Sequence, residues 1–460
     1  MGKNYLKEYD HWLACAETDE QTKAELRTIQ DDANEIKERF YQDLEFGTAG
    51  LRGVMCAGTN RMNIYTVRKT TQGLANYICD AGREAMKRGV AISYDCRHHS
   101  AEFALESARV LAANGVKAYL FDEMRPTPLL SFAVRHFGTF AGIMITASHN
   151  PAQYNGYKVY GEDGAQLGVG PSKTVMDYIE QMDMFTDVKT MPENEAKEAG
   201  LIVMVDEEIT EAFLKEALSY SLNPEAVKQD GRDFKIEFTP FHGTGLKPVQ
   251  EILKRAGFEN VYTVPEQAVA DPDFSTVKSP NPEDREGFAL AIALAKKVDA
   301  DVIIGTDPDS DRIGVLAKDA GGEYIVLTGN QTGELLTEYV LSEKAERGEI
   351  QTGDYIVKTI VTTDLVKKIA SSYGAETYEV FTGFKNIAEI IKNKEGKGEG
   401  EYLFGFEESY GYLPGTYARD KDAVTAALLV CEMAAVYKLK GMNLVDGLLK
   451  LYETYGTSVE

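Results

Sequence analysis

Three carboxylates stand at alternate positions in segment 305–312, which has the sequence Gly-Thr-Asp-Pro-Asp-Ser-Asp-Arg. An apolar run at 301–305 leads into it, and such runs are typical of strands. Carboxylates grouped after a strand can converge on one divalent cation, because hard cations prefer oxygen ligands. Without a cation, the three charges would repel one another and raise each other's pKa. The pattern predicts a metal site at Asp307, Asp309 and Asp311, and a solvated acidic turn is the alternative.

A serine also follows an apolar, strand-like run, in segment 146–151, which has the sequence Thr-Ala-Ser-His-Asn-Pro. A serine hydroxyl is a weak nucleophile and needs a base, a cation or a metal beside it. His149 and Lys158 are near enough in sequence to supply such groups to Ser148. The flanks do not form the GxSxG pattern of α/β-hydrolases. Two interpretations stay open, a nucleophilic serine loop and a tight turn with a hydrogen-bonded histidine.

Several further segments are weaker on their own. Segment 404–411 places Glu407 and Ser409 two residues apart, which suits vicinal sugar hydroxyls but is also typical of a helix N-terminus. The glycine-rich segment 46–53 carries Arg52, whose guanidinium can form paired hydrogen bonds to phosphate. Basic side chains also occur in the strings Thr-Gly-Phe-Lys (382–385) and Arg-Asp-Lys-Asp (419–422). Asp95, Arg97 and Ser100 are interpreted as a turn at the end of a strand, followed by a helix cap.

The predicted elements place these segments at strand ends. Short apolar runs alternate with amphipathic helices, such as 101–113 with Ser100 as its expected N-cap. This alternation predicts α/β layers with mixed, largely parallel sheets, in which ligands bind beyond the carboxyl ends of the strands. The runs are 90–94, 117–121, 142–146, 235–239, 301–305, 355–360 and 402–404.

A chain of 460 residues is too long for one core, so we expect several successive α/β domains around a central cleft. The first covers 1–195 and includes N-terminal helices and the serine loop, and the second covers 196–315 and includes the acidic loop. The third covers 316–440 and includes the Glu407 segment, and 441–460 forms a helical linker.

The composition narrows the function classes. The net charge of −24 disfavours nucleic acid and anionic membranes as partners. Five cysteines without a CxxC pair favour a reducing compartment over a disulfide framework or a zinc site. The N-terminus lacks the apolar region of a signal peptide, and no apolar run is long enough to span a membrane. We therefore expect a cytoplasmic protein that acts on a small molecule, as a monomer or a dimer.

Taken together, the motifs resemble those of the phosphohexomutase superfamily of phosphoglucomutases and phosphomannomutases. The resemblance runs from about residue 40 to the end and includes four motifs in the family's order. The strings TASHNP and GTDPDSDR carry most of it, and FGTAGLRG with NGYKVY is most similar to the phosphoglucomutase-2/phosphopentomutase branch. Family members end in a fourth domain with an Arg-x-Ser-Gly-Thr loop, and no such string occurs here, so we expect that domain to be absent.

The resemblance implies a role for each candidate residue. Ser148 would carry the phosphoryl group and touch one Mg²⁺, which the three aspartates 307, 309 and 311 would hold. Arg312 would contact the phosphoserine or the substrate, and Glu407, Ser409, Thr382 and Gly383 would bind the sugar. The phosphate-binding or proton-transferring groups would be Arg52, His149, Lys158, Lys385 and Lys421.

The implied reaction is the conversion of glucose 1-phosphate to glucose 6-phosphate through a phosphoserine and a sugar 1,6-bisphosphate, which also primes the enzyme. Phosphomannomutase and phosphopentomutase activities are alternatives within the family. Two alternatives come from other classes: a phosphatase with an aspartate nucleophile in the 307–311 loop, and a non-catalytic sugar-phosphate-binding protein.

Overall fold

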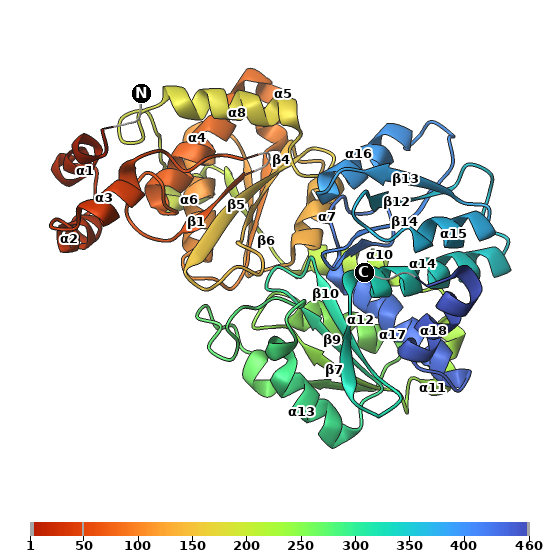
Figure 1. Cartoon of the computed structure of the whole chain (residues 1–460). Helices are drawn as coiled ribbons and strands as arrows, with labels where there is room; N and C mark the ends of the chain where they lie inside the picture. The colour runs from red at the N-terminus through yellow and green to blue at the C-terminus, as the bar shows by residue number, and fades with distance from the viewer. Residues whose placement is uncertain (1–3, 48–49, 458–460) are drawn as a thin grey trace.

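Three α/β units form the molecule in this computed structural model, which describes residues 4–47 and 50–457 (Figure 1). Each unit has a mixed sheet with helices on its faces, as the strand–helix alternation predicts. Residues Thr48 and Ala49 of the glycine-rich segment lie outside the described residues.

Unit I has a six-stranded sheet in the order β1-β5-β4-β2-β3-β6. The strands β4, β2, β3 and β6 run parallel to one another, whereas β5 is antiparallel to both β4 and β1. The strands are β1 (Gly50–Val54), β2 (Val90–Tyr94), β3 (Ala118–Phe121), β4 (Ala141–Ile145), β5 (Tyr154–Gly161) and β6 (Ile202–Val205). The helices are α4 (Ile64–Asp80), α5 (Arg83–Arg88), α6 (Ser100–Ala113), α7 (Thr127–Phe137), α8 (Val169–Gln181) and α9 (Glu193–Glu198).

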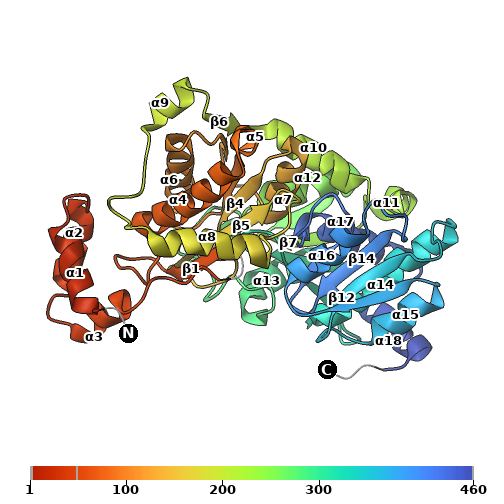
Figure 2. The same cartoon turned by 90° about the horizontal axis from the view of Figure 1, so that it is seen from above.

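The N-terminal helices α1 (Tyr5–Ala14), α2 (Glu20–Thr28) and α3 (Ala33–Phe40) stand apart at the outer end of unit I (Figure 2). They have a small core of their own, in which Trp12 packs edge-on against Phe40 and Tyr65. Tyr65 belongs to α4, so this core attaches the three helices to unit I, as the sequence predicts.

Unit II has a five-stranded sheet in the order β11-β10-β9-β7-β8. Its strands are β7 (Lys235–Thr239), β8 (Asn260–Thr263), β9 (Val302–Thr306), β10 (Ile313–Lys318) and β11 (Tyr324–Leu327). Its helices are α10 (Glu207–Leu218), α11 (Pro224–Asp230), α12 (Leu246–Ala256) and α13 (Ala289–Val298), with 3₁₀ turns at Pro265–Gln267 and Arg285–Phe288.

Unit III has a four-stranded sheet in the order β13-β12-β14-β15. Its strands are β12 (Tyr355–Thr359), β13 (Glu376–Val380), β14 (Tyr402–Glu407) and β15 (Gly411–Leu413). Its helices are α14 (Gly329–Glu346), α15 (Leu365–Ser372), α16 (Phe384–Lys394), α17 (Ala423–Leu439) and α18 (Leu444–Tyr455).

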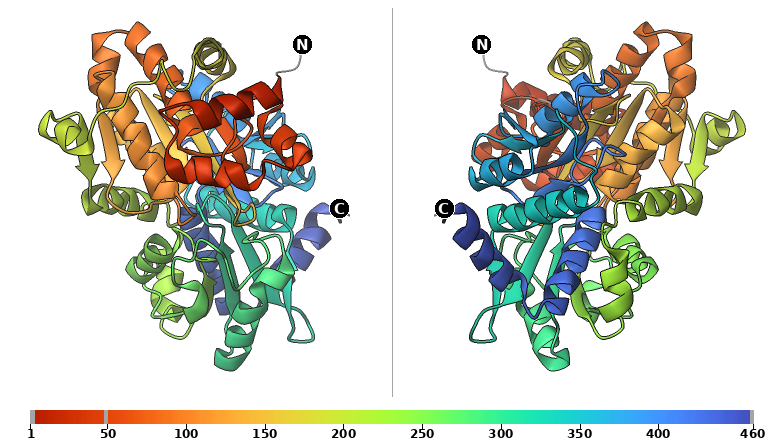
Figure 3. Two further views of the ribbon diagram at one scale, coloured as in Figure 1. Left: turned by 90° about the vertical axis from the view of Figure 1, so that its left-hand side faces the viewer. Right: turned by 90° about the vertical axis from the view of Figure 1, so that its right-hand side faces the viewer.

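Helix α17 joins units II and III. It is apolar on all sides and buried along most of its length, which is the pattern of a helix inside a core. It packs on α11 and α12 of unit II and on α14 of unit III (Figure 3). One buried apolar cluster continues through all four helices. The shared core fixes the loops of units II and III relative to each other.

The unit boundaries differ from the predicted ones, because strand pairing overrides local composition. Strand β6 pairs with β3, so unit I extends past residue 195. Strands β10 and β11 complete the sheet of unit II, so that unit extends past residue 315. Helix α18 packs on α14, α15 and β10, so it is part of the folded body and not a linker.

The expected N-cap of α6 also differs. His99, in a left-handed conformation, occupies that position without a side-chain cap, and the hydroxyl of Ser100 instead donates to Asp95. No helix in the described part of the chain is long and apolar enough to cross a membrane.

Candidate active site

The serine loop and the acidic loop meet where units I and II face each other. Ser148 lies in the turn between β4 and β5, and its hydroxyl donates a hydrogen bond of 2.7 Å to Oδ2 of Asp307. Nδ1 of His149 lies 3.3 Å from the same hydroxyl oxygen. Ser148 is only 3% exposed, and its φ of 52° is in the left-handed region. The loop therefore presents a buried hydroxyl directly to the acidic segment.

The three aspartates of the acidic loop form a compact set of oxygen ligands. One carboxylate oxygen from each of Asp307, Asp309 and Asp311 lies within 4.8 Å of the others, and all three side chains are buried. Oδ1 of Asp309 and Oδ1 of Asp311 have no hydrogen-bond partner among the described residues. Buried polar atoms are nearly always satisfied, and carboxylate oxygens are the ligands that a hard divalent cation prefers. The residues present therefore fit a metal ion, and a solvated acidic turn is excluded by burial.

The carboxyl groups of the triad have different electrostatic surroundings. Burial raises the pKa of Asp307 well above its ordinary value, and the charges of Asp309 and Asp311 add to this. Burial acts in the same direction on Asp309, but the nearby Lys158 ammonium and the hydrogen bonds with Asp307, Lys158 and Thr127 together outweigh it and hold the pKa of Asp309 low. Ionising all three carboxyl groups therefore calls for a cation among them, which favours a bound metal.

Two lysines reach the triad from different units. Nζ of Lys158, on β5, lies 2.8 Å from Oδ2 of Asp309 and 3.6 Å from Oδ2 of Asp311. Nζ of Lys421 lies 3.2 Å from Oδ2 of Asp311 and 3.8 Å from Oε1 of Glu407. Burial lowers the pKa of each lysine, but the surrounding carboxylates outweigh it and raise the pKa overall. Both lysines are therefore charged at neutral pH.

Unit III contributes a third loop to the site, segment 407–410 at the end of β14. The backbone N–H of Ile313 donates to the carbonyl of Tyr410 at 3.1 Å, which holds segment 407–410 beside the acidic loop. Glu407 is buried at the end of β14, whereas Ser409 is half-buried. Lys421 links the two loops, since it pairs with both Asp311 and Glu407. Segments from all three units therefore converge on one place.

The two arginines of the predicted site lie at its edge. Nη1 of Arg52, on β1, donates to Oδ1 of Asn150 at 3.1 Å. Arg312 closes the acidic loop, and its guanidinium reaches Glu283 at 3.3 Å. Burial, with the Arg312 charge beside it, lowers the pKa of His149 to about 3, so its imidazole is neutral at pH 7.

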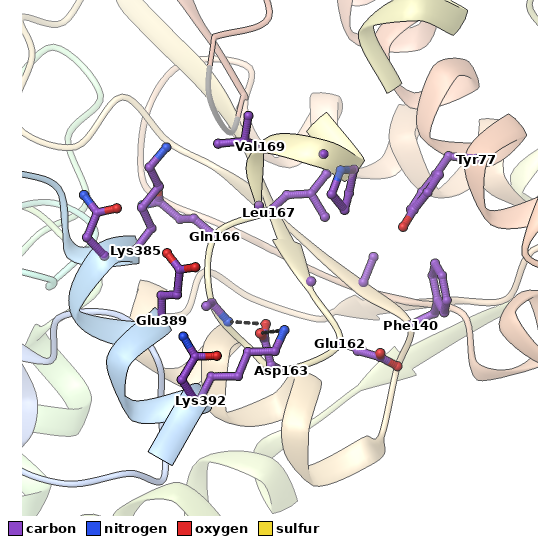
Figure 4. A pocket seen from close by; sticks show the side chains of 18 residues that line it. Tyr77, Phe140, Glu162, Asp163, Gln166, Leu167, Val169, Lys385, Glu389 and Lys392 are labelled. Carbon is purple, nitrogen blue, oxygen red and sulfur yellow. Dashed lines mark hydrogen bonds and ion pairs between the residues drawn. The ribbon is translucent and has the colours of Figure 1, made fainter. Parts of the chain in front are cut away.

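Three residues predicted from the family resemblance, in segment 382–385, are not joined to the triad directly in the part of the chain that the structure describes, although the ring centroid of Phe384 in that segment lies 5.6 Å from Nζ of Lys421. No hydrogen bond or ion pair within residues 4–47 and 50–457 joins Thr382, Gly383 or Lys385 to the triad. Lys385 instead lines a cavity of about 520 Å³ between unit I and α16, which an ion pair of 2.6 Å from Lys392 to Asp163 crosses (Figure 4). We place the chemistry at the triad and not in this cavity, because the hydroxyl, the carboxylates and the lysines converge there.

Two threonines that support the acidic loop are absent from the sequence predictions. Thr127 begins α7, and its N–H and hydroxyl donate to the carbonyl and Oδ2 of Asp309, each at 2.9 Å. Thr244 donates to the carbonyl of Pro308 through its N–H and its hydroxyl. The loop approaches so closely that a Cβ on Gly243 would lie 2.4 Å from Cα of Pro308. The Pro-Thr-Pro string at 126–128, just before a helix, is the sequence feature that could have identified Thr127.

The sequence matches one protein family in three consecutive segments. The matches are to phosphoglucomutase/phosphomannomutase alpha/beta/alpha domain I over residues 43–185, domain II over 211–322 and domain III over 328–455. These segments follow units I, II and III closely.

Known proteins agree with this match. A phosphoglucomutase of Staphylococcus haemolyticus (strain JCSC1435) is 37% identical over 99% of this chain and 79% of its own length. A phosphoglucomutase of Staphylococcus aureus (strain USA300) is 39% identical over 92% of this chain and 74% of its own length.

Solved structures share the fold. A protein of Thermus thermophilus, inferred to be a phosphomannomutase, superposes with a TM-score of 0.73 and 25% identity, covering 91% of this chain and 85% of that one. The open form of the Paramecium phosphoglucomutase parafusin has a TM-score of 0.68 at 17% identity, covering 91% of this chain and 75% of that one. With its three matched domains and its acidic triad, the chain belongs to the α-D-phosphohexomutase superfamily, whose enzymes are metal-dependent intramolecular phosphotransferases acting on sugar phosphates.

Proposed function

We propose that this chain interconverts glucose 1-phosphate and glucose 6-phosphate, with Ser148 as the phosphoryl carrier and glucose 1,6-bisphosphate as the intermediate. The hydrogen bond of 2.7 Å from Ser148 to Asp307 carries the proposal, because it brings a nucleophile to a set of metal-ligating groups. The two phosphoglucomutase relatives favour glucose over mannose or pentose phosphates.

The proposed cycle has two phosphoryl transfers. In the first, the bond from phosphorus to Oγ of Ser148 breaks and a bond to O6 of glucose 1-phosphate forms, while the O6 proton passes to a base and Oγ takes up a proton. The resulting bisphosphate turns around within the cleft. In the second transfer, Oγ of Ser148 gives up its proton, the phosphoryl group on O1 returns to Oγ, O1 takes up a proton, and glucose 6-phosphate leaves. Free glucose 1,6-bisphosphate would phosphorylate Ser148 in a resting enzyme by the same route.

The metal site fits Mg²⁺, which would be held by Asp307, Asp309, Asp311 and Ser148 and would neutralise charge on the phosphoryl group. The ammonium group of Lys158 pairs with the carboxylate oxygens of Asp309 and Asp311, and it would hold these oxygens in place while the phosphoryl group moves. Positioning and electrostatic stabilisation supply most of the rate in such transfers.

The remaining residues divide between proton transfer and binding. Lys421 would be the proton donor to the leaving oxygen, because it carries a proton and its Nζ lies between Asp311 of the acidic loop and Glu407 of the sugar-binding segment. The neutral imidazole of His149, with Nδ1 3.3 Å from Oγ of Ser148, would serve as a hydrogen-bonding partner at the phosphoryl group. The proposed substrate-binding residues are Glu407, Ser409, Thr382 and Gly383 for the sugar hydroxyls, and Arg52, Arg312 and Lys385 for phosphate.

A steady-state assay tests this function. The protein is incubated with glucose 1-phosphate, Mg²⁺ and a trace of glucose 1,6-bisphosphate, and both glucose 6-phosphate and free phosphate are measured. We expect glucose 6-phosphate without release of phosphate, and slower reactions with mannose 1-phosphate and ribose 1-phosphate. Release of free phosphate at the rate of sugar turnover would instead identify a phosphatase, and binding without either product would identify a sugar-phosphate-binding protein.

A further inference from the structure

Arg97 binds the backbone of the serine loop at several points. It is 3% exposed and follows β2, in a turn that the motifs of the proposed function leave without a role. Its Nη2 donates to the carbonyls of Ser148, at 2.6 Å, and of Asn150. Its Nη1 donates to the carbonyls of Pro151 at 2.9 Å and Tyr154 at 3.0 Å. One planar guanidinium therefore fixes four carbonyls of the turn that carries the nucleophile.

Asp95 fixes the other side of the same turn. Its buried carboxylate accepts hydrogen bonds from the hydroxyls of Ser100 at 2.7 Å and Thr146 at 2.6 Å, and it pairs with Nε of Arg97 at 3.3 Å. The hydroxyl oxygen of Thr146 accepts from the N–H of Ser148 at 2.8 Å. The N–H of Ser148 is thus held through Thr146 and its carbonyl through Arg97.

These hydrogen bonds to the N–H and the carbonyl of Ser148 explain how the residue keeps an unfavourable backbone conformation. A φ of 52° is unfavourable for a non-glycine residue, so surrounding contacts have to enforce it. The hydrogen bonds on both sides of the residue supply that constraint. The direction of the hydroxyl toward Asp307 follows from it.

Unit II also contacts the guanidinium group of Arg97, through an aromatic ring. The ring of Phe274, in the loop before the second 3₁₀ turn, lies with its centroid 4.9 Å from Cζ of Arg97. Phe274 is 1% exposed, and the hydroxyl of Ser279 in the same loop donates to the carbonyl of His149 at 2.9 Å. A cation over an aromatic face is attracted to it, more so when water is excluded. The unit that carries the acidic triad therefore also contacts the residue that shapes the serine loop.

We propose that Arg97, oriented by Asp95 and covered by Phe274, is the positioning residue that aims the Ser148 hydroxyl at the acidic triad and couples that aim to the docking of unit II. The inference rests on Ser148 as the phosphoryl carrier. Arg97 acts through the backbone of the serine loop, and among the described residues none of its hydrogen bonds or ion pairs is to the sugar-binding segment or to the triad. Its loss should slow phosphoryl transfer to Ser148 while sugar and metal binding persist.

The test compares four variants of the full chain: Arg97→Met, Arg97→Lys, Phe274→Leu and the double variant Arg97→Lys/Phe274→Leu. Arg109→Lys is the matched control, since Arg109 also joins a carboxylate and a backbone carbonyl, those of Glu106 and Met191, but on the outer side of α6. The readouts are the single-turnover rate of label transfer from glucose 1,6-bisphosphate to Ser148, the KM for glucose 1-phosphate and the Kd for Mg²⁺.

Misplacing a reacting group by about 1 Å can cost ~100-fold in rate. We therefore expect the labelling rate to fall about 100-fold in Arg97→Met, about tenfold in Arg97→Lys and about threefold in Phe274→Leu, with KM and Kd changed less than about threefold. The double variant should be less impaired than the product of its two single effects, because both substitutions disturb one arrangement. Arg109→Lys should label at the wild-type rate.

Wild-type labelling rates in folded Arg97→Lys and Arg97→Met would overturn the proposal, as would KM and Kd changes as large as the change in rate. If Arg97→Met does not fold, the other variants decide: independent, multiplying effects of Arg97→Lys and Phe274→Leu would contradict the coupling. Failure of the proposed function is distinguishable, because the wild-type protein itself would then take no label at Ser148.

Discussion

The hydroxyl of Ser148 donates a hydrogen bond of 2.7 Å to Asp307, which lies 159 positions further along the chain and in a different unit. Neither residue is informative alone, since serines and aspartates are common in turns. Their contact in a buried place, with two lysines beside the carboxylates, is what the chemistry of phosphoryl transfer needs.

The first prediction concerns the metal site. Asp309→Asn keeps the shape of the side chain but removes one of the charges that would hold Mg²⁺, so Mg²⁺ affinity should fall at least about tenfold. Phosphoryl transfer should fall with it. Isothermal titration calorimetry on both proteins measures the affinity without relying on turnover.

A suitable control for this substitution is Asp319→Asn, in the turn after β10, where the carboxylate accepts two backbone N–H groups. It should leave magnesium binding unchanged. Identical titrations of the wild-type protein and Asp309→Asn would exclude the acidic loop as the metal site.

The second prediction concerns Lys421, which lies between Asp311, Asp420 and Glu407. Lys421→Met removes the proposed proton donor, and loss of general acid catalysis costs about 10²–10⁴-fold in kcat. It also leaves buried carboxylates without their cation, so the free energy of unfolding should fall by about 3–5 kcal/mol. Steady-state kinetics and urea titration measure the two effects separately.

Lys438→Met serves for comparison, because Lys438 pairs with Asp230 and Asp301 near the far end of α17. It should retain full kcat. Should Lys421→Met remain as active as Lys438→Met, Lys421 has no part in proton transfer.

The third prediction is a pH dependence that arises in the core of unit II. Burial raises the pKa of Glu237, on β7, well above its ordinary value of 4.5, and neither of its carboxylate oxygens has a hydrogen-bond partner among the described residues. The folded protein therefore keeps this carboxyl protonated while the unfolded chain ionises it. Above pH 4.5 the unfolded state binds fewer protons, so stability falls by about 1.4 kcal/mol per pH unit until the native pKa is reached.

Glu237→Gln removes this ionisation without changing the size of the side chain. Its stability relative to the wild-type protein should rise between pH 5 and pH 8, as measured by urea titration at each pH. Glu225→Gln, on the exposed face of α11, should follow the wild-type profile. A difference between Glu237→Gln and wild type that stays constant over this range would contradict the shift.

Local sequence patterns were sufficient for most strands and for the acidic loop. The runs at 90–94 and 235–239 coincide with β2 and β7, because a buried strand needs only a short apolar stretch with clear turns around it. The spacing of Asp307, Asp309 and Asp311 predicts a candidate metal site directly, because all three aspartates come from one turn, and the structure brings their carboxylates together.

Local sequence patterns could not predict the features that depend on contacts between segments far apart in the chain. The boundaries at 195 and 315 were wrong because β6, β10 and β11 join sheets that begin far earlier in the chain. The prolines around Thr127 could have marked it as the start of a helix, but not its contact with Asp309, which lies 182 positions away. Arg97 was assigned to a turn, since nothing in its neighbourhood reveals four carbonyls that fold back onto it.

The central claim is that Ser148 carries the phosphoryl group, and labelled glucose 1,6-bisphosphate followed by peptide mapping tests it most directly. We predict one phosphate per chain in the wild-type protein, located on the peptide that contains Ser148, and no incorporation in Ser148→Ala. Retention of the label in Ser148→Ala, or its recovery on an aspartate of the acidic loop, would contradict the account.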